Sequence, residues 1–239
     1  MRRFGFADVY YDTWVVYRLL FRRSVATAAV VFAAITALEL GRHRFAVGGA
    51  GGAVGVVAFV VNWGAPVFVQ GAVVEIVRNL HERRPPEKIR TLYAKAGRRI
   101  RSLLWAAFVY GFGVFFGLIL LVVPGLIAAA RWCLMAPLIM LEGETAGTAR
   151  EISKLKVRGS TPGVATLLAI TYVVLNGPIA ALGYVLGNLT WNVAWCVWSS
   201  LTAPYYAHML TVLYYRFFEP DRPVVAQEVF GWRSVWEGR

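Results

Sequence analysis

The sequence is poor in the residues that most metal sites and active sites use. It has 2 cysteines and 3 histidines among 239 residues, with no Cys-x-x-Cys pair and no His-Glu-x-x-His motif. The Gly-x-Ser-x-Gly elbow of hydrolases and the glycine-rich P-loop are also missing. Both cysteines, Cys133 and Cys196, fall inside apolar stretches, where they are expected to act as small packing residues. The sequence therefore predicts no metal, no cofactor and no enzyme activity.

Charged residues are scarce as well. They make up 16% of the chain, whereas a soluble domain carries about a quarter, and hydrophobic residues make up 58%. The 25 lysines and arginines outnumber the 13 acidic residues, which gives a net charge of +12. Because these cations flank long apolar blocks, we expect their partner to be the anionic inner leaflet of a bilayer and not a nucleic acid.

Six apolar blocks predict an all-α, polytopic membrane helix bundle that forms a single domain over residues 1–239. A membrane helix needs about 20 largely apolar residues to cross roughly 30 Å of hydrocarbon. We expect the second block to form one long tilted helix with an irregular start. The first block lacks a small-residue cleavage site, so we expect a retained membrane helix and no cleaved signal peptide. The expected transmembrane helices cover residues 24–40, 50–77, 102–123, 126–141, 163–186 and 190–217.

The distribution of lysine and arginine predicts the orientation. With the N-terminus inside, 22 of the 25 lie in inner segments, only Arg42 and Arg44 lie outside, and Arg131 lies within a span. Basic residues accumulate in cytoplasmic loops. We therefore expect both termini in the cytoplasm and the protein in the cell membrane.

Three further stretches, at 6–22, 88–101 and 147–158, have apolar residues at helical spacing with cations opposite them. Such helices can lie in the interface with their basic side on lipid headgroups, or pack on the cytoplasmic ends of the bundle, and the two are compatible. In the second stretch, the cations expected to contact headgroups are Lys88, Lys95, Arg98 and Arg99.

Polar residues inside the expected spans are candidates for structural or functional contacts. An ionised group in hydrocarbon costs at least about 2.5–3.5 kcal/mol, so each charged residue should have a partner. We expect a contact between Glu39 and Arg131 in the outer half, with Glu75 and Glu142 at the inner interface. The full set is Glu39, Asn62, Gln70, Glu75, Arg131 and Glu142.

The segment from Leu120 to Leu126 ends a hydrophobic helix in Val-Pro-Gly, and Pro124 and Gly125 are expected to form the turn into the next helix. Arg131, Pro137 and Glu142 follow, and then Ser153 and Val157-Arg158-Gly159. This pattern resembles the membrane domain attached to bacterial glycerophosphodiester phosphodiesterases and found in related six-helix membrane proteins. The resemblance implies a membrane fold without phosphodiesterase activity, since that activity belongs to a separate soluble barrel for which this chain has neither room nor matching residues.

The favoured interpretation is a non-catalytic membrane protein that acts as a scaffold, a lipid-interacting protein or an accessory subunit, with a second copy or another membrane protein as its partner. One alternative is a small-solute transporter or channel that uses Asn62, Gln70 and Glu75. A water-filled cavity reaching Glu75 would favour it. A third is a lipid-modifying enzyme built around His81 and Glu142.

Overall fold

The computed structural model describes residues 5–45, 51–183, 185 and 188–220, and every regular element in these ranges is a helix. The all-α prediction is therefore confirmed for the described part of the chain. The elements are α1 (Phe6–Phe45), α2 (Gly51–His81), α3 (Ile89–Arg98), α4 (Ile100–Leu120), α5 (Val122–Trp132), α6 (Met135–Leu141), α7 (Ala146–Val157), a short 3-10 turn (Arg158–Ser160), α8 (Thr161–Gly183) and α9 (Asn188–Phe218).

Four helical stretches within the described residues are long and apolar enough to cross a membrane. They are Phe6–Gly41, Ile100–Leu120, Val122–Leu141 and Ala146–Gly183. Stretches of this length and composition indicate a membrane protein. The other two predicted spans correspond to α2 and α9, which are both continuous helices 31 residues long.

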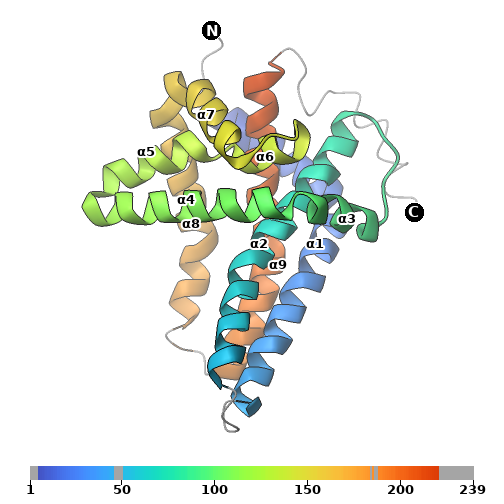
Figure 1. The fold of residues 1–239 in the computed structure, drawn as a ribbon. Coiled ribbons are helices and arrows are strands. Elements are labelled where there is room, and N and C mark those ends of the chain that lie inside the picture. The colour runs from blue at the N-terminus through green and yellow to red at the C-terminus, as the bar shows by residue number, and fades with distance from the viewer. Residues whose placement is uncertain (1–4, 46–50, 184, 186–187, 221–239) are drawn as a thin grey trace.

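The helices run in two directions (Figure 1). Helices α1, α2 and α9 pack side by side, and α8 runs along the same direction against α9. Helix α4 runs across this bundle, and α5 folds back beside it. Helices α6 and α7 pack against each other at one end, and α3 packs against α2 and the start of α4. The buried core joins both sets, with Leu103 of α4 and Leu134 among the fully buried side chains.

The predicted helix at 6–22 is not a separate element, because this stretch is the first half of one 40-residue helix, α1. No proline or glycine interrupts the chain between Phe6 and Leu40, so nothing ends the helix at the double arginine. Contacts with α9 fix the position of this first half. The Tyr17 hydroxyl donates to the Leu201 carbonyl oxygen at 2.9 Å, and Arg216 Nη2 lies 2.6 Å from Asp12 Oδ2.

The other two amphipathic stretches are helical close to their predicted ranges. The stretch at 88–101 contains α3 and the first residues of α4, and the one at 147–158 matches α7. Helix α7 begins after Thr145, whose hydroxyl oxygen accepts a hydrogen bond from the Thr148 backbone N–H at 3.3 Å.

The predicted fourth helix, 126–141, is not continuous. It is broken at Cys133 and Leu134 into α5 and α6. Ser153 of α7 stabilises this break, since its Oγ donates to the Arg131 carbonyl oxygen at 2.7 Å and accepts from the Leu134 backbone N–H at 3.3 Å. Groups released by a helix break need such partners when they are buried.

Ser153→Ala should therefore destabilise the junction of α5, α6 and α7. Ser153 is fully buried, so the change leaves a backbone donor and a backbone acceptor without their partner. We expect a loss of about 1–3 kcal/mol in the free energy of unfolding in detergent. Thr148→Ala, at an exposed position of the same helix, should cost less. Equal losses from the two substitutions would contradict this role.

Pro124 and Gly125 do not form the predicted turn. The chain reverses at Leu121, which is extended (φ −165°, ψ 146°), and Pro124 lies in the first turn of α5. Proline is tolerated there because its missing N–H would have no partner within the helix. Gly125 instead packs against α4, and a Cβ added to Gly117 would lie 2.8 Å from the Gly125 Cα. The two backbones are thus in direct contact.

Candidate functional site

A chain of charged groups joins the end of α2 to α3. Glu75 is 3% exposed, and its Oε2 lies 3.2 Å from Lys95 Nζ. Lys95 also binds Glu87 Oε1 at 2.6 Å, and Arg78 Nη1 lies 3.6 Å from Glu75 Oε1. Burial lowers the pKa of Lys95, but its hydrogen bond to Glu87 and its contacts with Glu75 outweigh burial, so the net pKa is raised. Lys95 therefore stays charged and neutralises Glu75.

This arrangement corrects one expected headgroup contact. Lys95 points inward to two carboxylates, because a buried Glu75 requires a cation. Arg99 is exposed but donates from Nη1 to the Gly143 carbonyl oxygen at 2.8 Å. Lys88 and Arg98 are exposed and have no ion pair within the described residues. Of the four predicted cations, these two remain available to a headgroup.

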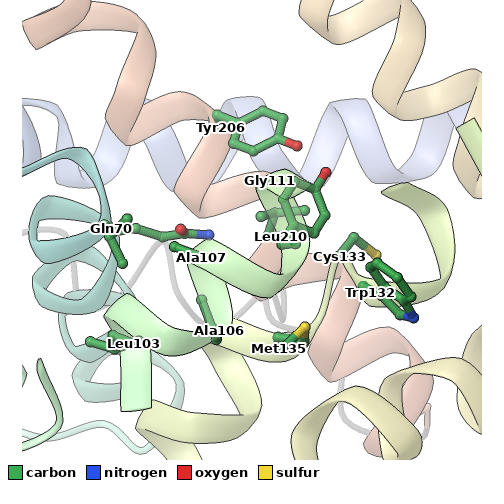
Figure 2. A pocket seen from close by; sticks show the side chains of 13 residues that line it. Gln70, Leu103, Ala106, Ala107, Gly111, Trp132, Cys133, Met135, Tyr206 and Leu210 are labelled. Carbon is green, nitrogen blue, oxygen red and sulfur yellow. The ribbon is translucent and has the colours of Figure 1, made fainter. Parts of the chain in front are cut away.

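Gln70 lines a cavity of about 250 Å³ between α2, α4, α9 and the break between α5 and α6 (Figure 2). Its side-chain amide points into this space, and Cys133 and Trp132 stand opposite. The hydroxyl groups of Tyr110 and Tyr206 interact with each other at the cavity wall. Apolar side chains from α2, α4 and α9 form the rest of the wall.

Glu75 does not line this cavity. Gln70 and Glu75 are five residues apart, which separates them by about 140° around a helix with 3.6 residues per turn. Gln70 therefore faces α4 while Glu75 faces α3. Asn62 belongs to α2, but its side chain lies outside the described residues. The continuous polar face expected on this helix does not extend to Glu75.

The expected contact between Glu39 and Arg131 is absent from the described residues, and the fold explains why. Glu39 lies in the last two turns of α1, at the end of the bundle away from α5 (Figure 1). Arg131 closes α5, which packs against α4, α7 and α8. The prediction assumed that α5 crosses the bilayer parallel to α1, so that equal distances along the two helices would mean equal depths.

Glu142 and His81 are each held by one of two adjacent tyrosines on α9. The Tyr214 hydroxyl donates to Glu142 Oε1 at 2.6 Å. The His81 ring stacks on Tyr215 with ring centroids 3.9 Å apart, and its Nε2 lies 3.1 Å from Glu219 Oε2. The two residues named for the enzyme alternative thus have separate structural partners.

Three polar contacts between distant segments had no signal in the sequence. Ser24 Oγ lies 2.9 Å from His208 Nε2, and both side chains are fully buried. The Tyr10 hydroxyl lies 2.9 Å from Thr171 Oγ1. The third is the ion pair between Asp12 and Arg216 described above. More than 150 residues separate the members of each pair, so no local spacing could indicate them.

The hairpin of α4 and α5 leaves a large apolar surface uncovered. On α4 only Leu103 and Ala106 are buried. Trp105, Phe112 and Ile119 follow one another at seven-residue spacing and are 60%, 47% and 64% exposed. Leu121 at the tip is 68% exposed. A surface of this size marks a contact with lipid or with another protein.

No protein-family model, curated protein or solved structure matches this chain.

Proposed function

We propose that this chain is a non-catalytic integral membrane protein that interacts with the cytoplasmic leaflet of the cell membrane, as a scaffold or an accessory subunit. The observation that supports this function is the α4–α5 hairpin, which is apolar, exposed and directed across the helices that would cross the bilayer.

The contacts between α4 and α2 support a position for the hairpin near the cytoplasmic boundary. A Cβ added to Gly64 would lie 3.1 Å from Leu104, and one added to Gly71 would lie 3.0 Å from Leu103. At 1.5 Å per residue from Gly51, the crossing lies about 20–30 Å along α2. With Gly51 at the outer boundary, a bilayer core of about 30 Å ends near this crossing, which supports a hairpin at the inner boundary, on the side that carries the cations.

In this arrangement α1, α2, α8 and α9 cross the bilayer, and α4 and α5 lie along the cytoplasmic leaflet. Four crossings keep both ends of the chain in the cytoplasm, as six would. The six predicted apolar segments are all helical in this arrangement. The two that contain α4 and α5 enter and leave the bilayer on its cytoplasmic side and do not cross it. The exposed Lys88 and Arg98 lie on the short segment that leads into α4, where an anionic headgroup would meet them.

The residues behind the family resemblance support a structural module. Ser153 holds the break after Arg131, and Glu142 accepts a hydrogen bond from Tyr214. We infer kinship with the membrane domain of the phosphodiesterases on these residues, without their soluble barrel. The transporter alternative is weaker because the cavity at Gln70 does not reach Glu75.

Depth measurements by spin labelling test the proposal. Single cysteines at Trp105, Phe112 and Ile119, in a Cys196→Ala background, are labelled with a nitroxide in vesicles that contain anionic lipid. Cys133 is 4% exposed and should not label. Because the hairpin lies parallel to the surface, we expect all three labels at about the same depth.

A helix that crosses the membrane would instead spread these labels by about 20 Å over fourteen residues, and that result would contradict the proposal. Ile170 and Gly177 of α8 provide the matched control, since Ile170 is exposed and a Cβ at Gly177 meets nothing within 4 Å. Labels at these two positions should differ in depth by about 10 Å.

A further inference from the structure

The cavity at Gln70 is small, and several of the side chains that line it can form hydrogen bonds. Its volume is about 250 Å³, and most of its lining is apolar. The Gln70 amide points into this space, and Tyr110, Cys133 and Tyr206 are among the residues that line it.

The Gln70 amide has no hydrogen-bond partner among the described residues. The Gln70 side chain is half-buried, and an amide that faces apolar groups without a hydrogen bond is unfavourable. Ala107 of α4 lies beside this amide, and Cys133 and Trp132 stand opposite (Figure 2). A molecule in the cavity could satisfy Gln70 and the tyrosine hydroxyls together.

We propose that the cavity binds a small, uncharged, lipid-soluble molecule that carries a carbonyl or hydroxyl oxygen. An apolar protein cavity of about 150 Å³ is known to hold benzene, so 250 Å³ has room for about ten non-hydrogen atoms. A complete phospholipid does not fit. The lining contains no lysine, arginine, histidine or acidic residue, so it cannot neutralise a charged ligand.

Matched pairs of ligands test this inference. Duroquinone and durene share a ring skeleton but only the first has carbonyl oxygens, and 1-octanol and octane form the corresponding chain-shaped pair. The purified Cys196→Ala protein is heated in detergent with each compound, and exposure of the buried Cys133 thiol to a thiol-reactive dye reports unfolding. At saturation we expect whichever of duroquinone and 1-octanol binds more tightly to raise Tm by about 5 °C. Its hydrocarbon partner should raise Tm by less. The pair that shows this difference identifies a ring-shaped or a chain-shaped ligand.

Gln70→Leu should abolish the preference for the oxygenated compound, because the leucine fills similar space without hydrogen bonds. Tyr206→Phe should reduce the preference and serves if Gln70→Leu does not fold. Tyr11→Phe, at an exposed tyrosine of α1, should leave it unchanged. The inference is overturned if neither oxygenated compound exceeds its hydrocarbon partner, or if the preference survives both cavity substitutions. These outcomes are independent of hairpin depth, so they leave the proposed function untouched.

Discussion

We expect Lys95→Ala to lower the free energy of unfolding by about 2–3 kcal/mol. The substitution leaves the carboxylate of Glu75, which is 3% exposed, without its nearest cation. Breaking a buried ion pair by removing one partner costs about 3–5 kcal/mol. The loss should fall at or below the lower end of that range, because Arg78 remains 3.6 Å from Glu75 and the Lys95 side chain is 26% exposed.

The measurement is unfolding in mixed detergent, followed by loss of the helical circular dichroism signal. Arg98→Ala is the control, since Arg98 is an exposed cation of the same helix and should change stability by about 0.5 kcal/mol or less. The double substitution Glu75→Gln with Lys95→Ala should be more stable than Lys95→Ala alone. If the effects of Glu75→Gln and Lys95→Ala simply add, the pair is not coupled.

The sequence correctly indicates that Glu75 needs a partner, but not which cation provides it. Lys95 and Arg98 lie on the same amphipathic stretch, and hydropathy assigns both to the polar side. Lys95 is adjacent to the buried Ala96, at the edge of the apolar stripe, so a four-carbon side chain can reach inward. Arg98 faces outward. Only the position of α3 against α2 distinguishes the two.

The existence of the helices is likewise predictable, whereas their directions are not. Apolar length predicts α4 and α8 equally well as helices that could cross a membrane. Hydropathy contains no information on direction, which depends here on the contacts of Gly64 and Gly71 with α4 and on the hairpin crossing at Gly117. The continuity of α1 also depends on tertiary contacts, since Ser24 meets a histidine 184 residues away.

The second large effect is expected at the crossing of α4 and α5. A Cβ on Gly117 would lie 2.8 Å from the Cα and 2.9 Å from the N of Gly125. These are backbone atoms, so no change of rotamer relieves the overlap. Gly117→Ala should therefore force the hairpin apart and cost about 1–3 kcal/mol, and Gly117→Val should cost more. Separation would also remove the close packing on which helix association in lipid depends.

Gly177→Ala is the matched control because it adds the same methyl group to a helix where nothing lies within 4 Å. Alanine is the better helix former by about 1 kcal/mol, so this substitution should leave stability unchanged or raise it. Stability in detergent and hydrogen exchange of the segment 112–128 provide the two readouts. In Gly117→Ala, exchange should increase in this segment and not in α8. If the two alanine variants are equally stable and exchange alike, the backbones of α4 and α5 are not in contact.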